Sequence, residues 1–182
     1  MKAIRVHETG GPDVLRYEEV ELPPPAPGQV RVRHTAIGVN FIDTYHRSGL
    51  YKLPLPTGLG SEAAGVVEAL GDGVATLKKG DRVAYAGTIG AYAEANNVPA
   101  DKLVKLPENV SDDAAAASLL KGMTVQYLLT RTYKVKPGET ILFHAAAGGV
   151  GLTFGQWAKH IGATVIGTVG SQDKIALAKS HG

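Results

Sequence analysis

The stretch whose residue types and spacing could do chemistry most clearly runs from Thr140 to Gly151, TILFHAAAGGVG. Its first four residues are apolar and β-prone, which predicts a short buried strand. Ala146, Gly148 and Gly151 then occupy the places of a G-x-G-x-x-G turn, with alanine at the first glycine. Apolar residues at helical spacing follow as far as Gly162, so the predicted order is strand, small-residue turn, helix.

A strand, a small-residue turn and a helix in this order can bind a pyrophosphate at the start of the helix. The first N–H groups of a helix have no partner inside it, and the helix dipole puts partial positive charge at the same end. Gly148 and Gly149 let the backbone approach a phosphate, and Gly151 lets the helix lie close to the strand. Ala146 fits such a turn only if its position needs no positive φ. We therefore expect a dinucleotide to contact four successive residues: Ala147, Gly148, Gly149 and Val150.

The other reading of these residues is a glycine-rich turn that binds nothing. A second apolar run, Val165 to Val169, favours the dinucleotide, because it is placed to pair in parallel with the first strand through a crossover. No acidic residue stands at its end, where NAD-binding proteins hold the ribose 2′-hydroxyl. Gly170, Ser171 and Lys174 offer backbone, a hydroxyl donor and positive charge instead, which suits a 2′-phosphate. This predicts NADPH rather than NADH.

Asp173 is the rival signal for the cofactor. A carboxylate there could bind the 2′-hydroxyl of NADH. We interpret Asp173 instead as the N-terminal residue of a helix from Asp173 to His181.

Composition excludes several classes of function. The 182 residues are 44% hydrophobic and 20% charged, as in ordinary globular proteins. Nineteen basic and 17 acidic residues are scattered along the chain, which predicts neither a nucleic-acid nor a membrane surface. There is no cysteine, and no run of about 18 apolar residues. We expect a soluble cytoplasmic protein without disulfides or thiolate metal sites.

The first hundred residues show short β-prone runs separated by Gly, Pro and Asp, which predicts a barrel-like or sandwich β domain. The expected strands are Ala3 to His7, Leu15 to Leu22, Val30 to Val39, Ala64 to Leu70, Arg82 to Ala86, Ala91 to Asn97 and Leu103 to Leu106. The PPPAPG segment from Pro23 to Gly28 is too rich in proline for a strand and is expected to be an extended connection.

The pattern changes to helical after Pro107. Ser111 is a suitable N-cap for an alanine-rich helix, and Gly122 is expected to separate it from a second helix that runs towards Tyr133. From Lys134 onward, 49 residues suffice for one β-α-β unit and the next helix. A doubly wound domain needs two β-α-β-α-β halves. The expectation is therefore an incomplete Rossmann domain in a fragment of a longer chain.

A second constellation lies in GVNFIDTYHRSGLY, residues 38 to 51. It places Asn40, Asp43, Tyr45 and Tyr51 in a segment that we expect to be loop-rich, just after a strand. The plainer interpretation is two surface tyrosines and a capping aspartate.

The motifs GVNFIDTYHRSGLY, GLGSEAAGVV, LKKGDRVAYA, LLKGMTVQYLL and FHAAAGGVG occur in this order. Together they resemble the zinc-free NADPH:quinone oxidoreductases, the zeta-crystallin-like branch of the medium-chain dehydrogenase/reductase superfamily, over essentially the whole chain. The resemblance implies an α/β protein with a GroES-like substrate domain, residues 1–124, and the first part of a Rossmann NADPH-binding domain, residues 125–182. It also implies a nicotinamide in the cleft between the domains, and a homodimer.

The resemblance also implies site residues. Tyr45 and Tyr51 match pocket tyrosines, Asn40 a residue near the nicotinamide, and Thr124 one near the ribose and nicotinamide. For Thr124 the alternative is a helix-capping role. Asn40 and Ser61 stand where zinc-dependent relatives have cysteine and histidine, and both are poor zinc ligands. No metal is therefore expected, and hydrogen-bond donors must meet the charge that develops on the acceptor oxygen.

Three functions stay open at this point. The first is NADPH-dependent reduction of quinones, and the second is reduction of activated alkenes such as enals or enones, which the same scaffold serves. The third is a non-catalytic NADPH-binding protein with a structural or RNA-binding role, against which the scattered charge argues.

Overall fold

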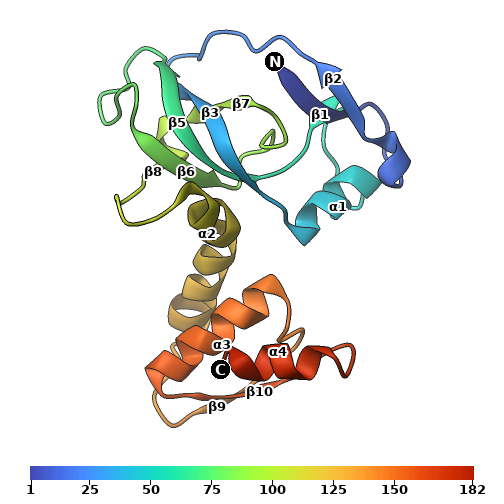
Figure 1. Cartoon of the computed structure of the whole chain (residues 1–182), viewed down its shortest axis with the longest axis vertical. Helices are drawn as coiled ribbons and strands as arrows, with labels where there is room; N and C mark the ends of the chain where they lie inside the picture. The colour runs from blue at the N-terminus through green and yellow to red at the C-terminus, as the bar shows by residue number, and fades with distance from the viewer. The chain divides into compact units, whose positions relative to one another are not determined.

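A computed structural model describes residues 1–182, and Figure 1 traces the chain through it. The chain forms two compact units, Met1–Leu120 and Lys121–Gly182. The division falls inside helix α2 (Asp112–Tyr127). The proposed domain boundary between residues 124 and 125 stays a prediction.

The first unit is built on a five-stranded antiparallel sheet. Its strands, in spatial order, are β7 (Ala95–Pro99), β3 (Gln29–Gly38), β5 (Glu62–Leu70), β6 (Arg82–Ala86) and β8 (Val104–Lys105). The Val-Arg alternation at the start of β3 explains its orientation, because Val30 and Val32 are fully buried in the core. Tyr85 and Val98 pack in the same apolar cluster.

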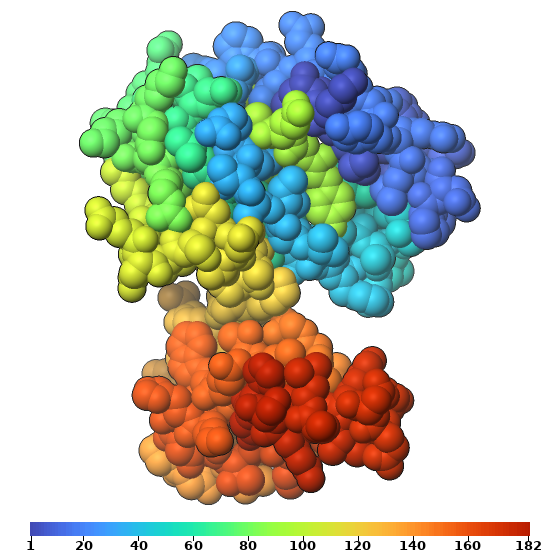
Figure 2. Space-filling view, in the orientation of Figure 1, coloured from blue at the N-terminus to red at the C-terminus, as the bar shows by residue number.

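A smaller sheet of three strands lies beside it, in the order β2 (Arg16–Glu19), β1 (Lys2–Val6), β4 (Thr57–Gly58). Two short 3₁₀ turns, η1 (Pro12–Val14) and η2 (Ala100–Lys102), connect strands. The amino terminus contacts residues far along the chain, since the Ile4 amide donates to the Tyr92 carbonyl at 2.7 Å. In Figure 2 the blue residues of the start of the chain accordingly lie beside the lime residues near position 95.

The prediction of short strands is confirmed, with shifted ends, and the structure pairs them antiparallel. The run expected as Ala91 to Asn97 becomes β7 only from Ala95. The residues before it bond to another loop instead: the Tyr92 amide donates to the Leu59 carbonyl at 2.9 Å. Tertiary hydrogen bonds here override the local β pattern.

Helix α1 (Phe41–Ser48) replaces the loop-rich segment expected after β3, so that expectation is wrong. A capping box starts the helix, because the Asn40 amide donates to the Asp43 carboxylate at 3.0 Å. Gly49, with a φ of 82°, ends it in the left-handed conformation. Eight residues with strong caps are enough for two turns of helix.

The expected break at Gly122 is also wrong, since α2 continues through it. A glycine in a helix costs only about 1 kcal/mol relative to alanine, and the alanines at 114–117 favour the helix. Ser111 caps α2 as predicted, accepting from the Ala114 amide at 3.1 Å. A π-helical turn, η3 (Leu128–Thr132), follows α2.

The second unit contains the predicted strand, turn and helix. Strands β9 (Thr140–Phe143) and β10 (Thr164–Gly167) pair in parallel, with helix α3 (Gly149–Ile161) between them and α4 (Lys174–Ser180) after them. Phe154 of α3 stacks on Phe143 with ring centres 4.2 Å apart. The parallel pairing and the helix end at Gly162 are confirmed.

The two-stranded sheet leaves apolar side chains uncovered, as expected from its size. Leu142 and Ile166 are opposite each other in register and are 61% and 56% exposed. No helix in the structure has both the length and the apolar character needed to span a membrane.

Candidate functional site

A buried polar cluster lies where β3 ends and β5 begins. Gly38, the last residue of β3, pairs with Glu62, the first residue of β5. Asn40, Asp43, Ser61 and Glu62 are all buried, and Glu62 is 0% exposed. Buried polar side chains need hydrogen-bond partners, and Asn40, Asp43 and Glu62 have them in one organised network, whereas Ser61 Oγ has none.

Asn40 is held at two points in this network. Its backbone amide donates to Asp43 Oδ2 at 3.0 Å, and its side-chain Nδ2 donates to Glu62 Oε2 at 2.7 Å. Asp43 Oδ2 also accepts from the Tyr92 hydroxyl at 2.7 Å. Burial, together with the Asp43 carboxylate, raises the pKa of Tyr92, so this hydroxyl stays protonated as a donor.

Glu62 joins the network to helix α2. Its Oε1 accepts from the Leu120 amide at 2.7 Å. A Cβ on Gly38 would lie 2.6 Å from Glu62 Oε2 and would overlap the Ala116 carbonyl oxygen. Only glycine therefore fits at the end of β3 while this carboxylate keeps its place.

The two predicted tyrosines come together in the structure. Tyr45 lies on α1 and Tyr51 just after it, with ring centres 5.4 Å apart in an edge-to-face pair. Phe41 packs edge-on against Tyr45 at 5.3 Å. Tyr51 is 51% exposed and Phe41 74%. The start of α1 thus combines a buried amide at Asn40 with an exposed aromatic surface.

The glycine turn has the backbone geometry of an anion site. Gly148 is the N-cap of α3, and its amide donates to the Ala145 carbonyl at 2.8 Å. A Cβ on Gly151 would lie 2.6 Å from the Ala146 carbonyl oxygen and would overlap that of Ala145. Gly151 therefore allows a close approach between the helix and the turn, whereas the sequence predicted a close approach to the strand. The first amides of α3 have no partner within the helix and are the groups that could bind phosphate.

The strained position in this turn is Ala145, with a φ of 56°, and not Ala146. Ala146 has no positive φ, which confirms the condition set for alanine at the first glycine position. Lys121 of α2 packs over the same turn: a Cβ on Gly149 would lie 2.8 Å from its Cε.

The residues predicted to hold a 2′-phosphate follow β10. They lie at the same edge of the sheet as the glycine turn, because both segments follow the carboxyl ends of parallel neighbours. The Ser171 hydroxyl donates to the Asp173 carboxylate and lowers the pKa of Asp173. Asp173 directly precedes α4, in the N-cap position, and Lys174 is the first residue of that helix.

No group of three or more histidine, cysteine, aspartate or glutamate side chains lies together in a way that could hold a metal ion. Three of the predicted site residues, Asn40, Tyr45 and Tyr51, lie on or beside helix α1 of the first unit. Thr124 lies in the part of α2 that belongs to the second unit.

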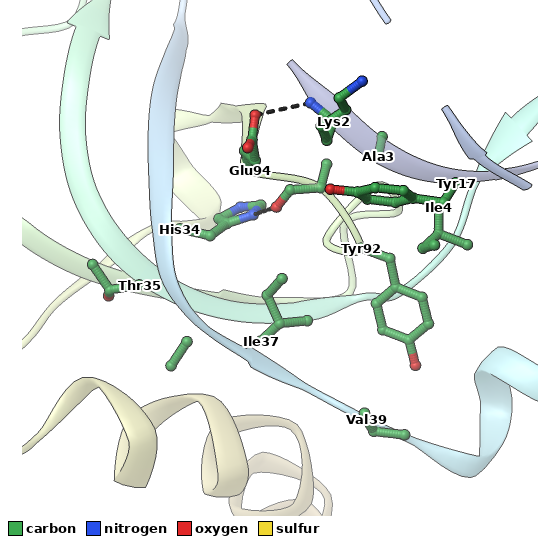
Figure 3. A pocket seen from close by; sticks show the side chains of 12 residues that line it. Lys2, Ala3, Ile4, Tyr17, His34, Thr35, Ile37, Val39, Tyr92 and Glu94 are labelled. Atoms are coloured by element: carbon green, nitrogen blue, oxygen red, sulfur yellow. Dashed lines mark hydrogen bonds between the residues drawn. The ribbon is translucent and has the colours of Figure 1, made fainter. Parts of the chain in front are cut away.

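The first unit also has a hollow of about 590 Å³, shown in Figure 3. Ile4, Ile37 and Tyr17 give it a mainly apolar lining, to which His34 of β3 also contributes. The His34 Nδ1 is 2.6 Å from the Ala93 carbonyl oxygen, and burial lowers the pKa of this ring. Of the polar cluster, only Tyr92 also lines the hollow.

Sequence reasoning missed two members of the network. In the sequence Glu62 stands out only as part of the GLGSEAAGVV motif, and nothing there indicates a role for Tyr92. A signal existed for Glu62, because a single charge opens the apolar run EAAGVV and such a charge is buried only when it is bonded. Tyr92 carries no comparable local signal, since its partner Asp43 is 49 residues away.

These features define a class of protein: a GroES-like β domain followed by a β-α-β unit of the Rossmann type. Residues 26–108 match the family model described as the alcohol dehydrogenase GroES-like domain. This combination is that of the medium-chain dehydrogenase/reductase superfamily, as the resemblance of the motifs implied.

Within this superfamily, the chain is most informatively compared with quinone oxidoreductases and a 2-haloacrylate reductase. The chain is 57% identical over its whole length to a quinone oxidoreductase of Pseudomonas aeruginosa and 51% identical to a 2-haloacrylate reductase of a Burkholderia species. The solved structure of Escherichia coli quinone oxidoreductase complexed with NADPH is 53% identical, covers 100% of this chain and superposes with a TM-score of 0.98. The chain spans 56% of that structure and of the Pseudomonas protein. It is thus similar, over its whole length, to about half of each of these quinone oxidoreductases.

Proposed function

We propose that the protein is an NADPH-dependent, metal-independent reductase of quinones. The observation that carries the proposal is the likeness, along the entire chain, to the Escherichia coli quinone oxidoreductase complexed with NADPH, at 53% identity and a TM-score of 0.98. A mycobacterial protein whose structure also contains NADPH is 50% identical, with a TM-score of 0.96.

Cofactor binding is assigned to the second unit. The amides of Gly149 and Val150 face the pyrophosphate, because the N-terminus of α3 offers donors that have no partner inside the helix, together with positive potential. Ala147 and Gly148 contact the pyrophosphate as part of the turn, since the Gly148 amide itself donates to the Ala145 carbonyl. Gly170, Ser171 and Lys174 hold the 2′-phosphate. Ser171 then exchanges its bond to Asp173 for one to the phosphate, and Lys174 supplies charge.

The chemistry is assigned to the residues around α1, with Thr124 near the ribose and nicotinamide. When bound, the nicotinamide supplies a hydride from C4. Tyr45 and Tyr51 bind the flat acceptor through their rings and donate hydrogen bonds to the oxygen that becomes negative. Asn40 is held rigidly beside them by Asp43 and Glu62. Without a metal, these donors provide the stabilisation of the developing charge.

Steady-state kinetics with a small quinone test the proposal. We expect NADPH to be oxidised with a higher kcat/KM than NADH, and Lys174→Glu to reverse or abolish that preference because it places a negative charge near the 2′-phosphate. An unchanged preference in Lys174→Glu, or equal kcat/KM for both nucleotides in the unaltered protein, would contradict the assignment.

The tyrosines have their own test. The double variant Tyr45→Ala, Tyr51→Ala should lose quinone turnover while NADPH still binds. Tyr51→Phe, which keeps the ring, should cost less than the ~10²-fold that loss of an essential oxyanion donor costs, because a quinone accepts hydride readily. Unaltered turnover in the double variant would remove both rings from the site.

A second candidate is the reduction of activated alkenes. The 51% identity to a 2-haloacrylate reductase over nearly the whole chain supports it, because a halogenated acrylate is an electron-poor alkene. Parallel assays with a quinone, an enone and 2-chloroacrylate at one NADPH concentration separate the two. A kcat/KM that is highest for the quinone supports the first proposal.

The assembly and location are further parts of the proposal. We propose a cytoplasmic homodimer whose partners are small molecules, as the family resemblance implies. Sedimentation equilibrium would test the assembly, with twice the monomer mass as the expected result and a single monomer mass as the contrary one.

A further inference from the structure

We propose that His34 is a pH-sensitive switch that holds the 87–94 loop, the residues between β6 and β7, against strands β3 and β6. The His34 ring makes two hydrogen bonds, one to this loop and one to β6. Protonation of the ring removes the acceptor for the second bond, so that acid releases the loop. The inference concerns the first unit alone and holds whichever acceptor the protein reduces.

The hydrogen bonds of the His34 ring define one tautomer. His34 Nδ1 lies 2.6 Å from the Ala93 carbonyl oxygen, which can only accept, so Nδ1 carries a proton. In a neutral imidazole the other nitrogen, Nε2, is then an acceptor. The Tyr85 hydroxyl, 3.0 Å away, must donate to it. The ring is therefore held in the neutral form with its proton on Nδ1.

The Tyr85 hydroxyl needs the acceptor that His34 supplies. Tyr85 is 0% exposed, so water cannot replace a lost partner. Its oxygen already accepts from Asn96 Nδ2 at 3.3 Å, and the same Nδ2 donates to the Ile89 carbonyl at 3.1 Å. Burial raises the pKa of Tyr85, so the hydroxyl keeps its proton. His34 Nε2 is the group that accepts it.

Protonation of His34 disrupts this arrangement in two ways. Nε2 then carries a hydrogen that points at the Tyr85 oxygen, and the hydroxyl hydrogen is left without an acceptor. A buried donor without an acceptor costs free energy, and so does a positive charge at this half-buried position. Burial accordingly lowers the pKa of His34, although the bond to the Ala93 carbonyl opposes the shift. Both costs disappear when the loop opens and the ring reaches water.

The other titratable groups around His34 do not offset its charge. Those that line the hollow with it are Lys2, Tyr17, Tyr92 and Glu94. The Glu94 carboxylate accepts from the Lys2 backbone amide at 2.8 Å (Figure 3). On the neighbouring strand, β5 places Gly65, which has no side chain, opposite His34. The shift in the His34 pKa comes from burial and the Ala93 carbonyl, and from no charged side chain.

The 87–94 loop links this switch to the start of α1. Ala93, to which His34 donates, directly follows Tyr92. The Tyr92 amide donates to the Leu59 carbonyl at 2.9 Å, and the Tyr92 hydroxyl donates to Asp43 Oδ2 at 2.7 Å. Asp43 is also the residue that caps α1. Release of the loop therefore weakens the polar cluster at the start of this helix.

Hydrogen exchange of the loop amides, measured by NMR, tests the switch. Because the pKa of His34 is lowered, its neutral form stabilises the closed loop fully above the unfolded value of about 6.5, and this stabilisation is lost as the pH falls below that value. The reporters are the Gly90 and Tyr92 amides, which donate to the Gly60 and Leu59 carbonyls. From about pH 7.5 to about pH 5.5, their protection relative to free amides should fall by up to about tenfold.

Two variants with the same substitution separate His34 from other titrating groups. In His34→Gln the amide still offers one donor and one acceptor but takes up no proton in this range, so the protection of the loop amides should become independent of pH. His160→Gln makes the same change at an exposed position of α3 and should behave like the unaltered protein. An equal fall in protection in His34→Gln and in the unaltered protein would overturn the proposal.

A measurement on the unaltered protein keeps the proposal testable even if His34→Gln does not fold. Long-range ¹H–¹⁵N spectra distinguish ring nitrogens that carry a proton from those that do not. At neutral pH His34 should show a protonated Nδ1 and an unprotonated Nε2, and Nε2 should gain its proton over the same pH range in which the loop amides lose protection. A proton on Nε2 at neutral pH, or titration of His34 with unchanged protection of the Tyr92 amide, would show that the switch does not exist.

Discussion

The polar cluster around Asn40 and the glycine turn before α3 represent two ways of building a binding site. The cluster is made of side chains: Asn40, Asp43 and Glu62 are buried, and hydrogen bonds link them to one another and to the half-buried Tyr92. The turn is made of backbone groups, and its glycines matter because they have no side chain. A change in the cluster therefore acts by removing a hydrogen-bond partner, and a change in the turn acts by adding atoms.

The largest expected effect comes from adding atoms to the turn. In Gly151→Ala the new Cβ would overlap the Ala145 carbonyl oxygen and lie 2.6 Å from that of Ala146, both on the backbone. We expect a loss of about 3 kcal/mol in the free energy of unfolding, as for severe overpacking, together with much weaker NADPH binding. Denaturant unfolding and nucleotide titration measure the two effects.

The control is the same substitution at another helical glycine. A Cβ on Gly122 meets nothing within 4 Å, so Gly122→Ala should stabilise the protein by up to about 1 kcal/mol. If Gly151→Ala and Gly122→Ala had the same effect, crowding at the turn would be refuted.

Removing a hydrogen-bond acceptor from the polar cluster should lower the free energy of unfolding. Asp43→Ala leaves the Asn40 amide and the Tyr92 hydroxyl without their buried acceptor, which should cost about 2 kcal/mol. Tyr92→Phe removes a single donor and should cost only about 1 kcal/mol. Chemical denaturation of both variants measures the difference, and an equal cost would mean that the bond to Asn40 contributes nothing.

A pH-dependent effect is expected at the start of α2. The Thr35 hydroxyl, and then Arg82 at 2.6 Å, hold the pKa of Asp112 below its usual value. A depressed pKa stabilises the fold above the unfolded value of about 4, and that stabilisation is lost as the pH falls through the folded value. Asp112→Asn should therefore cost roughly 1 kcal/mol at pH 7.

Thermal unfolding at several pH values checks this prediction. The difference between Asp112→Asn and the unaltered protein should shrink below about pH 4, where the aspartate becomes neutral. A difference that stays constant from pH 7 to pH 2.5 would show that charge plays no part.

The smallest effect is expected from relieving the strain at Ala145. Its φ of 56° suits glycine better than alanine. Ala145→Gly should therefore gain about 0.5 kcal/mol, because the relief of strain exceeds the added flexibility of the unfolded chain. Ala147 has no positive φ, and Ala147→Gly should be destabilising in the same assay.

The same contrast explains what could be predicted from the sequence. The order of strand, turn and helix could be predicted because its determinants are neighbours in the chain: Ala146, Gly148 and Gly151 lie at fixed spacing between a strand and a helix. The parallel pairing of β9 with β10 follows from the same local order. The strain at Ala145 was not predicted, because φ depends on how the turn closes.

The cluster was predicted only in part. The motif of residues 38 to 51 indicates two of its members, Asn40 and Asp43. The sequence predicts a loop where α1 begins, because the start of this helix depends on the Asp43 capping bond rather than on a long apolar pattern. Partners that are far apart in sequence, such as Asp43 and Tyr92, become neighbours only through the sheets. No local pattern reports such pairs.

The most direct test of the account is isothermal titration calorimetry of the protein with NADPH and NADH, each also titrated into Gly151→Ala. We predict that heat is released with NADPH, that NADH binds more weakly, and that Gly151→Ala removes most of the binding of both. No heat with either nucleotide, or equal binding by Gly151→Ala, would contradict the claim that the backbone of this turn holds the cofactor.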